Sequence, residues 1–404
     1  MQSVESLAKA AAEVAGRTVQ PNAQDAQPEQ DAQPERSDQR TPTSEHIPYP
    51  TTIREAALLT MAFFDAQGMA VTAFEVWRNL LRVQTSYASV AQELKQLAES
   101  GQICAEHGYY SIRGPEQVQQ RQLKIKQSET KWRRARLVAH LLSLVPFVTA
   151  SAVVDSVAFN KAKPGSDIDL FIVTKPGRLW TARMLTTGLT HVLRLRRHGK
   201  YIQDRACLSF YATSDALALG HLAITGGDLY LGQWVYLVST IWERKGFNLA
   251  ALLQAANPWA AELYPQARPA QLSDRRTTHD RSRYLARPIQ ALGELLLGGK
   301  RLGDRLDQRL RALQLRYMHK QAPFEIKTRT SHIVINDRML KFHEQDRRTW
   351  FRERTLATYQ KLQEGQKLQN GRSLDLSIDD IRFSAQGLMV QPVGATLQTA
   401  PRPT

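Results

Sequence analysis

The spacing of hydrophobic residues divides the chain into helical stretches on either side of one strand-rich stretch. From residue 51 to residue 100, apolar side chains recur at intervals of three and four, which places them on one face of successive helices. Between residues 101 and 113, short apolar segments are separated by Gly108, a pattern typical of a β-hairpin. Residues 51–115 are therefore predicted to form three short helices followed by two strands.

Helical spacing also dominates much of the chain after this first unit. Residues 116–144 form one predicted helix with many basic side chains, whereas residues 145–220 alternate between short apolar strands and helices. Helical spacing returns over residues 221–370, where the stretch 228–244 is apolar on nearly all sides and predicts one buried helix. The segment 340–343 is predicted to be a turn or a strand edge that packs on these helices.

Together these segments predict an α+β fold. Three helices that end in a two-stranded wing are the plan of a winged-helix-like domain (51–115), which either binds DNA or contacts a protein partner. A basic helical connector (116–144) leads to an α/β core with a mixed sheet (145–220), and a C-terminal helical domain (221–370) follows. We expect the helical domain to close over a site in the core.

The composition predicts disorder at both ends of the chain and a cellular location for the protein. Residues 1–50, rich in Pro, Gln and Asp, are predicted to be a disordered tail and residues 371–404 a flexible tail, because neither can bury much apolar area. Cys104 and Cys207 are the two cysteines, and they form neither a disulfide framework nor a zinc motif. With no apolar stretch long enough to span a bilayer, we expect a cytoplasmic protein that does not bind membranes.

The net charge of +16 and the pI of about 9.9 favour polyanionic partners, such as nucleic acid or nucleotides. A solvated basic surface would give the same charge. The sequence leaves these two interpretations open.

The α/β core contains the residues with the clearest chemistry. Asp167 and Asp169 alternate with Ile168 and Leu170 at the start of an apolar strand. Side chains alternate across a strand, so the two carboxylates project to one face while the two apolar side chains enter the core. Two neighbouring carboxylates repel each other unless a cation neutralises them, and their hard oxygen atoms suit Mg²⁺ or Mn²⁺. The pair is therefore a predicted metal site.

This motif resembles that of the nucleotidyltransferase superfamily that includes DNA polymerase β. The superfamily pattern is a Gly-Ser turn, a spacer of about ten residues and then an Asp-hydrophobic-Asp-hydrophobic strand. Asp155 and Ser156, the spacer 157–166 and the strand that starts at Asp167 fit this pattern, with Asp155 in place of glycine. A wider resemblance, over residues 53–354, links the chain to an uncharacterised bacterial group of nucleotidyltransferase-domain proteins.

The resemblance implies roles for individual residues. Asp167 and Asp169 would be catalytic metal ligands, and the turn formed by Asp155 and Ser156 would bind the nucleotide, with Ser166 beside the strand. The side chain of Asp155 would crowd the phosphate and add negative charge there.

A third carboxylate is expected on a later strand, here the strand over residues 206–212. Its central polar position is Ser209, so Asp204, just ahead of it, is the predicted third catalytic carboxylate, and a turn residue is the alternative. Arg178 and Arg183, near the start of the next helix, are predicted to clamp phosphate, although pairing with a neighbouring acid would explain them equally well.

Three functions remain open. The first is a Mg²⁺-dependent enzyme that moves a nucleotidyl group from a nucleoside triphosphate to an acceptor hydroxyl on RNA, protein or a small molecule. The second is a catalytically degenerate scaffold with the same fold that binds protein or nucleic acid. The third is a DNA-binding regulator that acts through the winged-helix-like domain. Nucleotide binding in the presence of Mg²⁺ separates the first from the other two.

Overall fold

The computed structural model describes residues 47–269, 280–321, 333–342 and 346–365. The two predicted tails lie outside these ranges except for residues 47–50, and there the predicted boundary needs correction. Ile47 is buried, and a β-carbon added to Gly227 would lie 2.5 Å from Ile47 Cδ1. The guanidinium of Arg82 lies 3.7 Å from the centre of the Tyr49 ring. Apolar contacts thus fix the chain ahead of the first described helix.

The N-terminal unit contains three helices and a small antiparallel sheet. Its elements are α2 (Ile53–Ala66), β1 (Val71–Thr72), α3 (Ala73–Arg78), α4 (Tyr87–Glu99), β2 (Cys104–Glu106) and β3 (Tyr109–Ser111). Thr52, Thr72 and Ser86 each accept a backbone N–H bond at the start of a helix, which defines the three N-termini. The sheet order is β1-β3-β2, so the predicted hairpin gains a third strand. β1 has only two residues, too few for a periodic pattern in the sequence.

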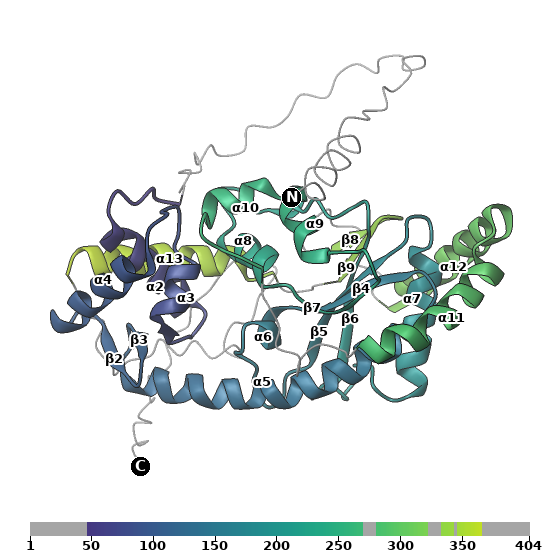
Figure 1. Cartoon of the computed structure of the whole chain (residues 1–404), viewed down its shortest axis with the longest axis horizontal. Helices are drawn as coiled ribbons and strands as arrows, with labels where there is room; N and C mark the ends of the chain where they lie inside the picture. Colours follow the sequence, from purple (N-terminus) through teal and green to yellow (C-terminus); the bar gives the residue numbers. More distant parts are fainter. Residues whose placement is uncertain (1–46, 270–279, 322–332, 343–345, 366–404) are drawn as a thin grey trace, which may run out of the picture.

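Helix α5 (Pro115–Leu142) connects this unit to the main sheet and runs along the bottom of Figure 1. Pro115 begins the helix, where its missing N–H costs no hydrogen bond. Two of its cations are buried rather than solvated. Arg121 donates to the backbone oxygens of Phe159 and Asn160 and to Glu75, and Lys131 donates to the backbone oxygen of Ser166, the residue before Asp167. The connector is therefore part of the packed structure.

The main sheet has six strands in the order β7-β4-β5-β6-β9-β8. β5 and β6 are parallel, and all other neighbours are antiparallel, so the sheet is mixed as expected. The elements of the predicted core are β4 (Val148–Val153), α6 (Asp155–Ala158), β5 (Ile168–Thr174), α7 (Leu179–Val192) and β6 (Ala206–Thr213). The protein therefore has a mixed α+β fold.

The segment 221–370 is not all helical, which corrects the prediction. It contributes three strands to the sheet, and the predicted single helix over 228–244 is a helix followed by a strand. The elements are η1 (Gly220–Leu222), α8 (Leu229–Leu237), β7 (Ser239–Glu243), α9 (Leu249–Ala256), α10 (Pro258–Leu263), α11 (Asp280–Leu297), α12 (Lys300–Gln321), β8 (Ile333–Ile335), β9 (Met339–Phe342) and α13 (Arg348–Gln363). β7 pairs with β4, and this pairing ends helical structure after Leu237. The predicted turn or strand edge at 340–343 falls within β9, which pairs with β6.

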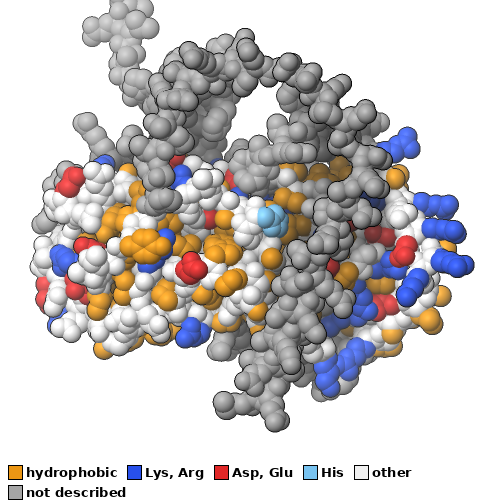
Figure 2. Space-filling view, turned by 90° about the horizontal axis from the view of Figure 1, so that it is seen from above, with side chains coloured by type: hydrophobic (Ala, Val, Ile, Leu, Met, Phe, Trp, Pro, Cys, Tyr) orange, Lys and Arg blue, Asp and Glu red, His pale blue; other side chains and the backbone are white. Residues whose placement is uncertain are grey.

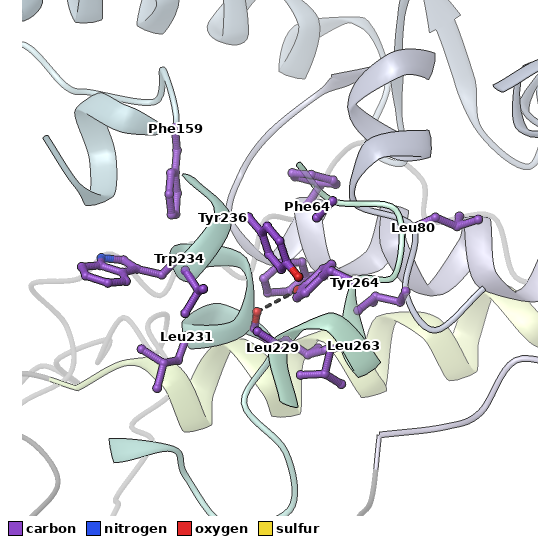
Figure 3. Close-up of a cluster of buried hydrophobic side chains, with 14 of the residues drawn as sticks. Phe64, Leu80, Phe159, Leu229, Leu231, Trp234, Tyr236, Leu263 and Tyr264 are labelled. Atoms are coloured by element: carbon purple, nitrogen blue, oxygen red, sulfur yellow. Dashed lines mark hydrogen bonds between the residues drawn. The ribbon is translucent and has the colours of Figure 1, made fainter. Parts of the chain in front are cut away.

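Two hydrophobic clusters cover the two faces of the sheet. The first runs without a break from the N-terminal unit through α8, α9 and α10 to Phe171 and Val173 of β5. Figure 3 shows part of it, where residues from α2, α8 and α10 meet and the Tyr264 hydroxyl donates to the Leu229 backbone oxygen at 2.7 Å. The second cluster joins Ile168, Leu170 and Ile172 to α5 and α7. The N-terminal unit therefore shares its core with the C-terminal half.

The outer ends of the molecule differ in charge. Figure 2 shows Lys and Arg side chains gathered at the end that carries α11 and α12, where Lys300, Arg301, Arg305 and Arg309 are exposed.

Within the parts of the chain that the structure describes, we find no helix with the length and hydrophobicity needed to cross a membrane.

Candidate active site

The two aspartates of the predicted metal site lie at the start of β5. Asp167 precedes the strand and Asp169 is its second residue, and both are partly buried. Ile168 and Leu170 belong to the cluster on one face of the sheet, whereas Phe171 and Val173 belong to the cluster on the other. This alternation places Asp167 and Asp169 on the Phe171 side, where their carboxylates come together.

Cys207 of β6 lies beside Asp167 and Asp169, and we call these three residues the acidic cluster. The parallel pairing of β5 and β6 sets Cys207 beside Asp169, and one oxygen from each aspartate and the Cys207 sulfur all lie within 4.8 Å of one another. Burial raises the pKa of the Cys207 thiol, and the charges of Asp169 and Asp167 raise it further. A protonated thiol is a poor ligand for a hard cation, so the two carboxylates are the groups that suit Mg²⁺.

Asp204, the predicted third carboxylate, is outside this cluster of three. Its Oδ1 atom accepts a hydrogen bond from Lys131 Nζ at 2.6 Å, and its backbone N–H bonds to the Ser166 oxygen at 3.1 Å. Lys131 Nζ also donates to the backbone oxygens of Pro164 and Ser166, at 3.1 and 2.6 Å. Asp204 thus fixes the turns that precede β5 and β6, which matches the alternative given for it above.

Arg197 forms an ion pair with the acidic cluster. Its Nη1 atom lies 2.7 Å from Asp167 Oδ2, and its side chain is 47% exposed against 13% for Asp167. The guanidinium offsets part of the repulsion between the two carboxylates. Nothing in the sequence pattern singled out this residue, because it lies thirty positions after its partner.

The turn at Asp155 and Ser156 lies directly against Asp169. The backbone N–H of Val154 donates to the backbone oxygen of Asp169 at 3.1 Å, and α6 begins at the next residue. Asp155 has a φ of +54°, the left-handed region that glycine adopts freely and aspartate tolerates. Backbone geometry therefore explains why this position can exchange glycine for aspartate. The Asp155 carboxylate is fixed by the Tyr230 hydroxyl, which donates to Oδ1 at 2.9 Å.

A partly buried cation, Lys161, lies close to this turn. Its Nζ atom donates to Gln67 Oε1 at 2.7 Å and lies 4.7 Å from the Phe159 ring centre and 5.2 Å from that of Tyr230. Burial lowers its pKa to about 7, although the Asp155 charge opposes this shift. No local sequence pattern indicates Lys161, because its partners Gln67 and Tyr230 lie far away in the chain.

The remaining predicted site residues have structural partners. Arg178 donates to Asp304 at 2.6 Å and to the Gly298 oxygen at 3.0 Å. Arg183 donates to Gln314 at 2.5 Å, and burial lowers its pKa. Both contacts attach α7 to the α11–α12 segment. Ser166 donates from Oγ to the Lys163 oxygen at 3.0 Å and shapes the turn before Asp167.

No protein-family model, curated protein or solved structure matches this chain. The nucleotidyltransferase assignment is therefore itself a proposal, supported by the resemblance of residues 155–170.

Proposed function

We propose that the protein is a Mg²⁺-dependent nucleotidyltransferase that uses a nucleoside triphosphate. The observation that carries the proposal is the convergence of Asp167 and Asp169 beside the turn at Asp155 and Ser156. Two carboxylates that share one face of a strand, next to a tight turn, are an arrangement that suits Mg²⁺-assisted nucleotidyl transfer.

Each residue of the site has a separate role in the proposed reaction. Asp167 and Asp169 would hold Mg²⁺ or Mn²⁺, and the cation would supply positive charge to the triphosphate. The backbone and hydroxyl of Ser156 would bind phosphate oxygens, and Asp155 would stay bound to Tyr230 and away from them. Arg197 would exchange its ion pair with Asp167 for one with a phosphate oxygen. Asp204 would act as a positioning residue through Lys131.

The N-terminal unit would serve as a winged-helix-like domain. Its three helices and three strands have the composition of that fold, and its partner would be a protein rather than DNA, because α4 carries Lys95 between two acidic neighbours. We place the reaction in the cytoplasm, where Cys104 and Cys207 would remain free thiols.

Label transfer from α-³²P-labelled nucleoside triphosphates tests the proposal. The Asp167→Asn and Asp169→Asn double variant is expected to lose Mg²⁺-dependent labelling of an acceptor by at least about a hundredfold, because both metal ligands lose their charge. Asp215→Asn, which alters an exposed aspartate that pairs with Arg338, is the matched control and should retain labelling. Undiminished labelling by the double variant would rule the proposal out.

Cys207 favours a second candidate, a catalytically degenerate scaffold with the same fold that binds protein or nucleic acid and shows no Mg²⁺-dependent nucleotide binding. The third carboxylate expected for the superfamily is replaced here by a protonated thiol. Calorimetry with each nucleoside triphosphate, with and without Mg²⁺, detects binding independently of transfer. The Cys207→Asp variant sharpens the choice: labelling that appears only in this variant identifies the natural protein as the degenerate form.

A further inference from the structure

A basic β-hairpin borders the acidic cluster. His198 and Tyr201 exchange backbone hydrogen bonds at 3.2 and 2.9 Å across the turn made by Gly199 and Lys200, and Gly199 has a φ of +49°. The hairpin is attached to β6, since Ala206 donates to the Leu195 oxygen at 2.8 Å and accepts from Arg197 at 2.9 Å. We call residues 194–205 the basic hairpin.

The charge of the basic hairpin is almost entirely positive. It carries five cations: Arg194, Arg196, Arg197, Lys200 and Arg205. Its single acidic residue, Asp204, is already paired with Lys131 of α5. One of the five cations, Arg197, reaches Asp167, so the positive surface begins at the predicted metal site. A polyanion that followed this surface would arrive at the two carboxylates.

Aromatic rings accompany the cations. His198 lies between His191 and Tyr201, with ring centres 5.2 Å apart on each side. The Tyr201 side chain is 50% exposed, and Lys200 and Arg205 lie 5.7 and 6.0 Å from its ring centre. Exposed aromatic rings among cations bind single-stranded nucleic acid, because a base stacks on the ring while phosphates contact the charges. Bases in a duplex are already stacked and cannot reach such a ring.

We propose that the basic hairpin binds a single-stranded polynucleotide whose end is the acceptor for transfer. This assignment of the acceptor rests on the proposed function, whereas binding of the strand does not. In the transfer, the terminal hydroxyl oxygen forms a bond to the α-phosphorus of the nucleotide, the bond to pyrophosphate breaks and the hydroxyl proton passes to water. Arg197, the cation of the hairpin that contacts Asp167, is where strand and nucleotide would meet.

Fluorescence anisotropy with dye-labelled oligouridylate and oligothymidylate of about a dozen nucleotides tests the binding. Tyr201→Ala is expected to weaken binding about fivefold or more, and Tyr201→Phe to retain it, because stacking needs the ring and not the hydroxyl. The Arg194→Gln and Lys200→Gln double variant should lower the slope of log affinity against log salt by roughly 1.4, the value for two phosphate contacts on a single strand. Circular dichroism verifies that each variant folds.

The matched control removes two exposed arginines from α5, Arg133→Gln together with Arg134→Gln. It should leave both affinity and salt slope unchanged. An equal loss in this control, or binding of a duplex as tight as that of the single strand, overturns the proposal, as does the absence of binding. Comparison of the ribose and deoxyribose strands identifies the acceptor class.

The two proposals fail in different ways. If binding depends on the hairpin but wild-type protein neither binds Mg²⁺ and nucleotide in calorimetry nor extends the strand, the transferase proposal falls and the hairpin remains a binding site. If the wild-type protein transfers label but the hairpin variants bind the oligonucleotides as the wild type does, the hairpin proposal falls alone.

Discussion

Two arginine–aspartate ion pairs in this protein have the same distance between nitrogen and oxygen but differ in burial. Arg348 Nη1 lies 2.7 Å from Asp228 Oδ2, and Arg197 Nη1 lies 2.7 Å from Asp167 Oδ2. The exposed fractions are 8% and 0% for Arg348 and Asp228, but 47% and 13% for Arg197 and Asp167. Burial, and not distance, therefore distinguishes the two pairs: Arg348 and Asp228 belong to the interior, whereas the Arg197 side chain is open to solvent.

The environment of Arg348 is closed. Its guanidinium also contacts Asp346 and donates to the Leu222 oxygen at 2.7 Å, while Asp228 accepts from the Leu231 N–H at the start of α8. Burial would raise the pKa of Asp346, but the hydrogen bonds and charge of Arg348 outweigh it and hold that pKa at about 2. This network joins α13 to α8 and has little freedom to rearrange.

The largest predicted effect on stability follows from breaking the buried pair of Arg348 and Asp228. Arg348→Ala leaves Asp228 charged, buried and without its cation, so we expect a loss of about 3–5 kcal/mol in the free energy of unfolding. Urea denaturation followed by circular dichroism measures it. Lys361→Ala, an exposed cation on the same helix, is the control, with an expected change within about 0.5 kcal/mol. A loss below about 1 kcal/mol for Arg348→Ala would contradict the comparison.

An intermediate effect is expected at Lys161, a partly buried cation that contacts an amide and aromatic rings. Its pKa of about 7 in the folded protein lies below the ordinary value of 10.5. Between these values the unfolded chain binds more protons than the folded protein, so stability rises with pH. Below about pH 7 both states are protonated, and the cost of burying the charge is fully present.

The Lys161→Met variant should lack this rise. The unfolding free energy of the wild type, measured relative to Lys161→Met at pH values from about 6 to about 9.5, should increase above pH 7 by no more than about 1.4 kcal/mol per pH unit. Lys163→Met, two positions away and exposed, should follow the wild-type profile. Parallel profiles for wild type and Lys161→Met would show that Lys161 stays charged throughout.

The smallest effect on stability is expected at the exposed pair of Arg197 and Asp167. Arg197→Gln should change the unfolding free energy by less than about 1 kcal/mol, because the guanidinium is half exposed. The same variant should bind Mn²⁺ more tightly without nucleotide, as paramagnetic resonance of the ion can measure, since the competing cation is gone. Arg338→Gln, from the exposed pair with Asp215, should change neither quantity appreciably. Weaker Mn²⁺ binding by Arg197→Gln would indicate that Arg197 supports the metal site.

Local patterns predicted much of the fold. The predicted helix over residues 116–144 corresponds to α5 (Pro115–Leu142), and the start of β5 follows from the alternation of Asp167, Ile168, Asp169 and Leu170. The strand β7 could not be predicted in the same way. Residues 228–244 are apolar without a clear period, and the strand forms only because β4, far earlier in the chain, pairs with it.

The candidate site was predictable to the same extent. Alternation along one strand is local, so it indicated that Asp167 and Asp169 share a face. Their third neighbour depends on the parallel register of β5 and β6, which the sequence does not encode locally, and that register brings Cys207 to Asp169 where Asp204 was predicted. The basic hairpin and Lys161 likewise depend on contacts between distant segments.

The arrangement of α13 has a consequence for synthesis of the protein. This helix is the last described element, yet it lies along α2, the first helix described after residue 46, and Tyr359 and Leu362 belong to the same cluster as the α2 side chains. As the chain leaves the ribosome, the N-terminal unit must wait for α13 with part of its apolar surface uncovered. The core of the N-terminal unit can therefore be completed only after α13 has been synthesised.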